Sequence, residues 1–214
     1  MPVFRRRLPH IYIDQHPVFV TWRLEFSLPQ CLLRQLREQK DALTHKLESL
    51  SEEYKKLQLY QHSKKQFDLT DAVLGTDTSL PHSLMLPELA AIITESLHFL
   101  DSRKYCLHAF CIMPNHLHLL ITPYRFETKA HTELSDILKS LKGFTAHKIN
   151  KLLHREGAFW HSESYDHYIR SEVEFYRVVD YIVQNPVKAK LVQSWWQWQH
   201  TWLEAPLRER YPTP

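Results

Sequence analysis

The sequence has 214 residues, of which 43% are hydrophobic and 24% are charged, and its formal net charge is +3. These values are typical of a soluble globular protein that is large enough to bury a core. The slight positive charge allows a polyanionic partner without requiring one. The three glycines stand alone in the sequence, which excludes a glycine-rich phosphate loop.

The three cysteines, Cys31, Cys106 and Cys111, have spacings that fit neither a disulfide framework nor a zinc ribbon. The N-terminus has a basic triplet but no apolar run of the kind found in a signal peptide. No apolar stretch approaches the length that spans a membrane. We therefore expect a reduced, cytoplasmic protein with no membrane partner.

Hydrophobic periodicity, prolines and polar clusters predict secondary structure along the whole chain. The predicted elements are a strand at 17–24, a long helical stretch at 31–60 in the form of a hairpin or arm, a polar loop at 61–83, a helix at 88–101, strands at 105–113 and 116–122, a helix at 134–153, a short strand at 165–170 and a helix at 171–185.

This order predicts an α+β fold. It is the ferredoxin-like β-α-β-β-α-β arrangement, an antiparallel sheet with helices on one face, followed by a further C-terminal helix. The chain 1–214 is interpreted as one domain, with a helical insertion at about 31–83 in the first crossover. Residues 193–214 form an aromatic tail, for which we consider packing against the core or stacking on nucleic-acid bases.

Two histidines begin the second strand of the predicted hairpin. Side chains alternate between the faces of a strand, so His116 and His118 leave one face while Leu117 leaves the other. Two imidazoles on adjacent same-face positions are half of a divalent metal site. A His-x-His pair alone is also compatible with two ordinary histidines on a half-exposed strand.

The last predicted helix has a defined start and carries two functional side chains. Ser171 and Glu174 have the spacing of a capping box, and Pro186 is expected to end the helix. Tyr181 and Asn185 lie about 40° apart around the helix axis, on one face. Tyr176 lies about 140° from Tyr181, so the two tyrosines are not expected to act as a pair.

Three segments together resemble a known family. Met-Pro-Asn-His-Leu-His-Leu-Leu at 113–120, Tyr-Asp-His-Tyr-Ile-Arg at 165–170 and Asp-Tyr-Ile-Val-Gln-Asn-Pro-Val-Lys-Ala at 180–189 resemble the REP-associated tyrosine transposases. These belong to the HUH single-strand endonucleases, which are named for a histidine–hydrophobe–histidine motif. Each segment alone is a weak signal, whereas their order and approximate spacing agree with the family.

The resemblance implies a site and a chemistry. His116 and His118 would bind a divalent metal, Mg²⁺ or Mn²⁺, and Asn185 would complete its shell. Tyr181, on what would be a catalytic helix, would be the nucleophile that joins a 5′ phosphate and leaves a free 3′ hydroxyl. The implied substrate is single-stranded DNA, in the form of palindromic hairpins with a short guide sequence. The implied assembly is a monomer or a homodimer.

Basic side chains outside these motifs are candidates for contacts with DNA phosphates. They are Arg5, Arg6, Arg7, Lys139, Lys142 and Arg170. Asp166 and His167 are further candidates to assist the tyrosine, although a structural role at the strand end suits them better.

Two other functions are consistent with the sequence. A domesticated protein could keep the fold and only bind hairpin DNA, through its basic residues and aromatic tail. A zinc hydrolase could use His116 and His118 with water as the nucleophile, but the sequence offers no clear third ligand at a recognisable spacing.

Overall fold

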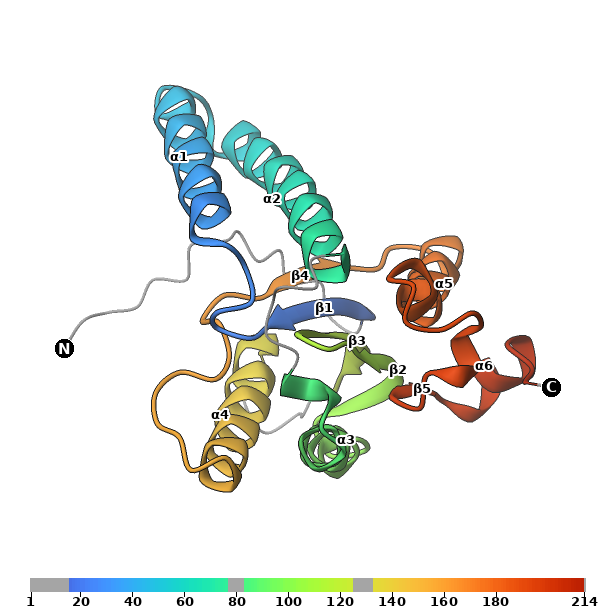
Figure 1. Cartoon of the computed structure of the whole chain (residues 1–214). Helices are drawn as coiled ribbons and strands as arrows, with labels where there is room; N and C mark the ends of the chain where they lie inside the picture. Colours follow the sequence, from blue (N-terminus) through green and yellow to red (C-terminus); the bar gives the residue numbers. More distant parts are fainter. Residues whose placement is uncertain (1–15, 77–82, 125–132, 214) are drawn as a thin grey trace.

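The computed structural model describes residues 16–76, 83–124 and 133–213 (Figure 1). In this part of the chain, five strands form one antiparallel sheet in the order β4-β1-β3-β2-β5. The strands are β1 (Val18–Arg23), β2 (Tyr105–Ile112), β3 (His116–Pro123), β4 (Tyr165–Tyr168) and β5 (Thr201–Leu203). The order of the first four strands confirms the predicted ferredoxin-like fold.

One face of the sheet is covered by α3 (Pro87–Leu100) and α4 (Leu134–Leu152). The buried side chains of this layer include Leu117 and Leu119, which alternate with the two histidines of β3. Alternation along β3 therefore places His116 and His118 on the opposite face, as the sequence predicted.

The opposite face packs against α5 (Glu172–Lys188). Ser171 caps this helix, because its side-chain oxygen accepts a hydrogen bond from the backbone N–H of Glu174 at 3.2 Å. The carboxylate of Glu174 instead accepts from the backbone N–H of Arg170 at 2.8 Å, so the reciprocal bond of a capping box is not formed.

The prediction that Pro186 ends this helix is wrong, because α5 continues to Lys188. Proline removes one backbone donor, but its fixed φ is compatible with the last helical turn. The Ala189 N–H donates to the carbonyl of Asn185 at 2.9 Å, which carries the turn past the proline.

A helical arm, formed by α1 (Gln30–Leu47) and α2 (Glu52–Thr76), projects from the sheet (Figure 1). The predicted hairpin is thus present, but the loop predicted at 61–83 is wrong as far as residue 76. Residues 77–82 lie outside the described part of the chain. The segment 30–74 contains no glycine or proline, so its polar residues form the exposed surface of a helix rather than a loop.

The tail forms structure that the sequence did not predict. After a short 3₁₀ turn (Trp195–Gln197), β5 adds an edge strand next to β2, and α6 (Ala205–Arg210) follows. Trp202 stacks on Phe110 with ring centroids 5.8 Å apart, and the Trp198 indole N–H donates to the Ile112 carbonyl at 2.9 Å. Packing against the sheet therefore accounts for these two tryptophans.

None of the helices in the described residues combines the length and the apolar character needed to cross a membrane.

Candidate active site

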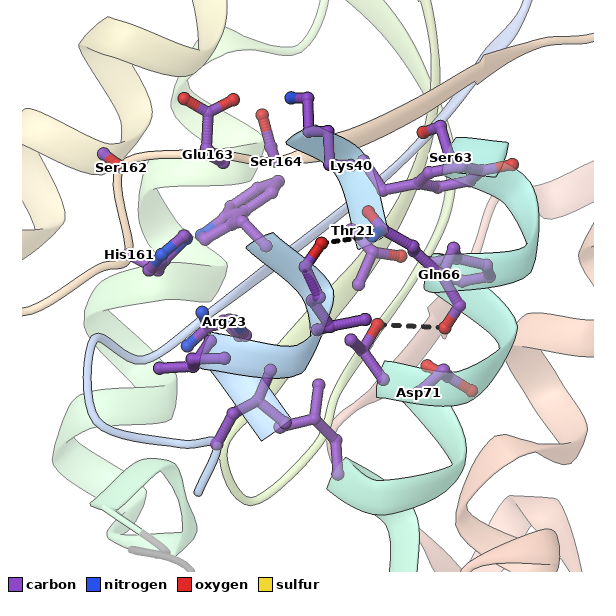
Figure 2. A pocket seen from close by; sticks show the side chains of 18 of the residues that line it. Thr21, Arg23, Lys40, Ser63, Gln66, Asp71, His161, Ser162, Glu163 and Ser164 are labelled. Carbon is purple, nitrogen blue, oxygen red and sulfur yellow. Dashed lines mark hydrogen bonds between the residues drawn. The ribbon is translucent and has the colours of Figure 1, made fainter. Parts of the chain in front are cut away.

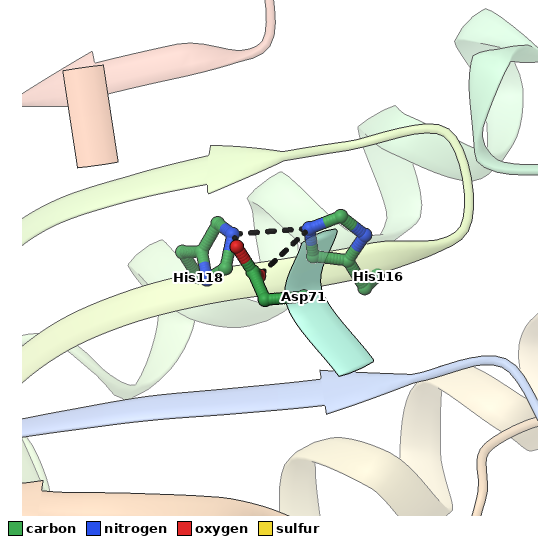
Figure 3. A group of neighbouring side chains, drawn as sticks. All are labelled: Asp71, His116 and His118. Carbon is green, nitrogen blue, oxygen red and sulfur yellow. Dashed lines mark hydrogen bonds and ion pairs between the residues drawn. The ribbon is translucent and has the colours of Figure 1, made fainter. Parts of the chain in front are cut away.

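His116 and His118, at the start of β3, are fully buried. The alternative of two ordinary histidines on a half-exposed strand is therefore wrong, and α2 of the helical arm lies over the start of β3 (Figure 3). The two rings meet edge to face, with their Nε2 atoms 3.0 Å apart.

Each imidazole is oriented through its other nitrogen. His116 Nδ1 lies 2.7 Å from the side-chain oxygen of Asn115, and the amide nitrogen of Asn115 donates to the Leu74 carbonyl at 3.2 Å. His118 Nδ1 lies 2.8 Å from Thr21 Oγ1, because Thr21 is paired with His118 in the register of β1 and β3. An imidazole that donates from Nδ1 presents a lone pair at Nε2, which is the arrangement found in metal-binding histidines.

Both histidines are neutral at physiological pH. Burial lowers the pKa of His116 from 6.5 to about 3, with a further decrease from the neighbouring His118. Burial also lowers the pKa of His118 to about 3, and the positive charge of Lys188 acts in the same direction. Neutral imidazoles are the form that binds metals.

Asp71 on α2 brings a carboxylate to the same point. Its Oδ1 atom lies 3.4 Å from His118 Nε2 and 3.8 Å from His116 Nε2 (Figure 3). Asp71 Oδ1 is buried and has no hydrogen-bond partner. The potential ligand atoms of the three residues all lie within 4.8 Å of one another. Sequence reasoning missed Asp71 because it assigned this position to a loop.

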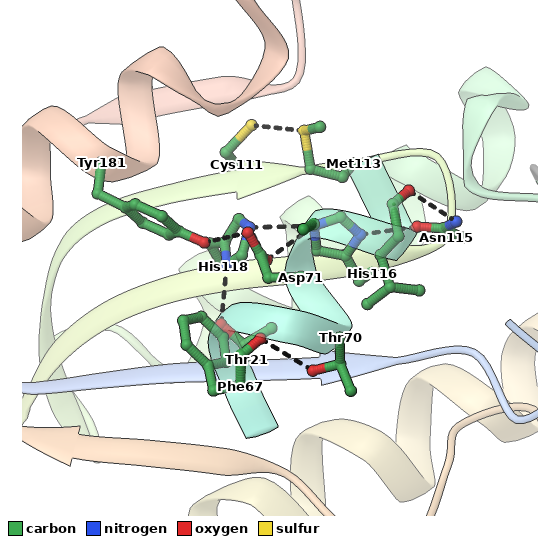
Figure 4. Close-up of polar contacts among 12 residues, drawn as sticks. Thr21, Phe67, Thr70, Asp71, Cys111, Met113, Asn115, His116, His118 and Tyr181 are labelled. Atoms are coloured by element: carbon green, nitrogen blue, oxygen red, sulfur yellow. Dashed lines mark hydrogen bonds and ion pairs between the residues drawn. The ribbon is translucent and has the colours of Figure 1, made fainter. Parts of the chain in front are cut away.

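Tyr181 on α5 reaches this cluster from the other side (Figure 4). Its ring centroid lies 5.3 Å from that of His118, and its hydroxyl donates to Asp71 Oδ2. Asn185 is also buried, and its side chain lies close enough to His118 and Tyr181 to influence the pKa of each. The structure therefore brings together all four residues to which the sequence assigned the reaction, within one chain.

The free protein holds Tyr181 as a phenol. Burial raises its pKa well above the usual value of 10, and the nearby Asp71 carboxylate raises it further. The ammonium of Lys188 lies over the ring, 4.9 Å from its centroid. A buried phenol needs a change in its electrostatic surroundings before its oxygen can act as a nucleophile.

A cavity of about 650 Å³ lies next to the cluster, between the helical arm, β1 and the segment 161–165 (Figure 2). Thr21 and Asp71, which contact the imidazoles, also line this cavity. Its wall carries positive charge from Arg37 and Lys40 and negative charge from Glu163. The cavity is therefore polar and charged, and Thr21 and Asp71 lie between it and the buried imidazoles.

The candidate DNA-contacting residues lie in several places. Lys139 is exposed on α4, on the far side of the sheet from the cluster, and Arg170 is exposed after β4. Lys142 donates to the carbonyls of His161 and Ser162 at 2.7 and 2.9 Å, which fixes one wall of the cavity. Arg5, Arg6 and Arg7 lie outside the described residues. A DNA contact at any of these positions stays a prediction.

His167 has a structural environment. Its Nε2 atom lies 2.7 Å from a carboxylate oxygen of Glu174, and its Nδ1 atom pairs with the hydroxyl of Tyr60. These contacts join β4 to α5 and to the arm. They agree with the structural role that the sequence favoured for this residue.

This chain is similar to known proteins in sequence and in fold. The family model described as "Transposase IS200 like" matches residues 83–185. The fold is similar to a solved structure of a REP-associated tyrosine transposase bound to a REP hairpin, with a TM-score of 0.51 and 18% identity over 94% of this chain and 82% of that one.

A second solved structure, of a Deinococcus radiodurans R1 protein described as a transposase, has 15% identity and a TM-score of 0.31, over 84% of this chain and 98% of that one. No curated protein matches the sequence. The matched segment 83–185 contains both histidines, Tyr181 and Asn185, whereas Asp71 lies outside it. The segment 83–185, a little under half of the chain, is therefore similar to the IS200-like transposases.

Proposed function

We propose that this protein is a metal-dependent endonuclease and strand-transferase that acts on single-stranded DNA next to hairpins. The observation that supports this most directly is the meeting of His118 and Tyr181, which come from distant parts of the sequence and lie with ring centroids 5.3 Å apart. A metal-binding pair next to a buried tyrosine is the arrangement that phosphotyrosine chemistry requires.

The residues present fit a divalent cation. Two Nε2 atoms and one unpartnered carboxylate oxygen converge on one buried point, and Asn185 lies beside them. When bound, Mg²⁺ or Mn²⁺ would act as a Lewis acid that neutralises the oxygens of a phosphodiester. Thr21 and Asn115 would hold the two imidazoles in the orientation that presents Nε2.

Tyr181 would carry the covalent step. Its oxygen attacks phosphorus, the bond from phosphorus to the 3′ oxygen breaks, and the DNA 5′ phosphate is joined to the tyrosine. Tyr181 gives up its proton in this step, and the departing 3′ oxygen takes up one proton and becomes a free hydroxyl, so the proton count is unchanged. A hydroxyl of another DNA end can reverse the step, because phenolate is a competent leaving group. In the free protein, the Tyr181 proton points at Asp71 Oδ2.

Hairpin DNA is the proposed substrate. The solved structure with a similar fold is a transposase bound to a REP hairpin. In this chain, the cavity beside Asp71 would hold a single strand next to the cluster, with Arg37 and Lys40 near its phosphates. The contact of Tyr181 with His118 inside one chain would allow a monomer to act, and would also allow a homodimer.

A denaturing gel tests this function. The protein is incubated with hairpin oligonucleotides that carry single-stranded flanks, in Mn²⁺, and a covalent protein–DNA adduct is expected. Tyr181→Phe should form no adduct. Tyr176→Phe, on the same helix but facing elsewhere, is the matched control and should form it. An adduct in Tyr181→Phe would show that the nucleophile is assigned wrongly.

One observation favours a second candidate, a protein that only binds hairpin DNA. The arm covers both histidines, so a phosphodiester cannot reach them in this form. The same gel separates the candidates, because hairpin binding without metal-dependent cleavage would support the binding protein. If Tyr181→Phe still cleaves the DNA and no adduct forms, water would be the nucleophile and the protein would be a metallohydrolase.

A further inference from the structure

We propose that Asp71 is an anionic metal ligand of this site. The helical arm would then complete the metal centre together with residues 83–185, the part that matches the transposase family, which we call the transposase segment. This inference rests on the proposed function and adds a residue to it. Asp71 belongs to α2, outside the segment 83–185 that matches the family. The metal-binding set would then be His116, His118 and Asp71, with Asn185 beside it.

The first support is the unpartnered oxygen. Asp71 Oδ1 is buried, has no hydrogen-bond partner and faces two imidazole nitrogens at 3.4 and 3.8 Å. The Nε2 atoms are themselves only 3.0 Å apart. Of these three atoms, the two Nε2 atoms can share one N–H, whereas Asp71 Oδ1 has no donor, and a buried oxygen without a partner is unfavourable. A divalent ion would satisfy all three.

The second support is the way in which α2 is held. Phe67 stacks on Tyr165 with ring centroids 4.1 Å apart and lies edge to face with Phe19 at 5.9 Å. At the other end of the helix, the Asn115 amide donates to the Leu74 carbonyl. Asp71 lies between these two attachments. A side chain on a helix anchored on both sides is positioned as a ligand needs to be.

The third support is the chemistry of the donors. Two imidazoles alone are a poor site for Mg²⁺ or Mn²⁺, because these cations prefer oxygen ligands. A carboxylate provides both a preferred oxygen and a negative charge. Asp71 also touches the nucleophile, since its Oδ2 accepts the hydroxyl proton of Tyr181. One carboxylate would thus fix the position of the tyrosine oxygen relative to the metal.

Titration of the metal-free protein with Mn²⁺, by calorimetry and by electron paramagnetic resonance, tests this proposal without any DNA. Asp71→Asn keeps the size of the side chain and removes its charge, and we expect its Mn²⁺ affinity to fall at least about tenfold. The matched control is Asp68→Asn, which makes the same charge change one turn earlier on α2, at an exposed position. Its affinity should equal that of the wild type.

Asp71→Cys provides a second measurement. A thiolate ligand favours soft cations, so this variant should bind Cd²⁺ more tightly, relative to Mn²⁺, than the wild type does. A purely structural role for Asp71 would not change this preference. Circular dichroism melting of each variant reports whether it folds.

The outcomes separate the two proposals. If Asp71→Asn and Asp68→Asn bind Mn²⁺ as the wild type does, and Asp71→Cys shows no change in metal preference, the role of Asp71 is overturned while the proposed function stands. If the wild type binds no Mn²⁺ and forms no adduct, the proposed function is overturned together with the inference.

Discussion

The transposase segment and the helical arm contribute to one site by different physical means. In the segment 83–185, His116 and His118 are placed by strand alternation, and Tyr181 and Asn185 by helical periodicity. In the arm, Asp71 is placed by docking of a helix whose own exposed surface is mostly polar. Local chain geometry therefore fixes four side chains, and tertiary packing fixes the fifth.

The largest expected effect comes from removing a histidine of the transposase segment. His118→Ala should abolish Mn²⁺ binding and adduct formation, because it removes one of three converging ligand atoms. It should also lower the free energy of unfolding by about 2–4 kcal/mol, since it leaves a cavity and an unpaired Thr21 hydroxyl. Calorimetric metal titration and urea unfolding measure the two effects.

His147→Ala is the matched control for this change, because His147 is exposed on α4. It should alter neither quantity. Unchanged Mn²⁺ affinity in His118→Ala would remove the transposase segment from the metal site.

The next effect concerns the contact between the transposase segment and the helical arm. The side-chain oxygen of Asn115 pairs with His116 Nδ1, and its amide nitrogen donates to the Leu74 carbonyl in the arm. Asn115→Ala should weaken Mn²⁺ binding about 10–100-fold, as loss of a group that orients a metal-binding histidine does. Metal titration provides the measurement.

The control for Asn115 is another asparagine that donates to a backbone carbonyl. The Asn150 amide donates to the Gly157 carbonyl at 2.8 Å, away from the cluster. Asn150→Ala should lose stability, by about 1 kcal/mol, without losing metal affinity. Equal metal affinities for the two variants would mean that Asn115 has no orienting role.

A smaller effect is expected when the arm is only loosened. Phe67→Ala removes the stacking on Tyr165, an aromatic contact worth about 0.5–1.5 kcal/mol beyond its buried area. If the arm presents Asp71, this energy should appear as a two- to tenfold loss of Mn²⁺ affinity, by the usual conversion of about 1.4 kcal/mol per tenfold.

Leu69→Ala serves as the control. It changes a side chain on the same helix that is 42% exposed. It should leave the affinity unchanged. A Phe67→Ala variant that binds Mn²⁺ as tightly as Leu69→Ala would separate the arm from the metal site.

The contrast between the regions also explains which features the sequence could predict. The strand order follows from the order of the predicted elements, and the common face of His116 and His118 follows from period-two alternation. The pairing of Tyr181 with Asn185 follows from helical periodicity. Each of these inferences needs only a few neighbouring residues and a known fold.

The remaining features depend on contacts between distant segments. Residues 61–76 are polar and read as a loop, yet they form a helix whose polar side chains stay in solvent. Nothing near Asp71 in the sequence indicates that its carboxylate meets β3, because this meeting depends on the packing of Phe67 and Leu74. The burial of the two histidines was missed for the same reason, since their cover comes from the arm.

The pH dependence of stability tests whether the arm buries the two histidines. In the unfolded chain an imidazole binds a proton below pH 6.5, whereas folded His116 and His118 have pKa values of about 3 and stay neutral. Between these limits the unfolded state holds more protons. The free energy of unfolding of the metal-free protein should therefore fall as the pH is lowered from 6.5 toward 3. The decrease is at most about 1.4 kcal/mol per pH unit for each histidine, and these two add no slope above pH 6.5.

Urea unfolding at pH 7.5 and at pH 5 measures this slope. Burial is the main cause of the low pKa values. If the arm provides that burial, Phe67→Ala should let the pKa of both imidazoles rise and should reduce the slope. Leu69→Ala should keep the slope of the wild type. If Phe67→Ala keeps the full slope, the histidines are shielded by β3 and α5 alone, and the arm does not cover the site in solution.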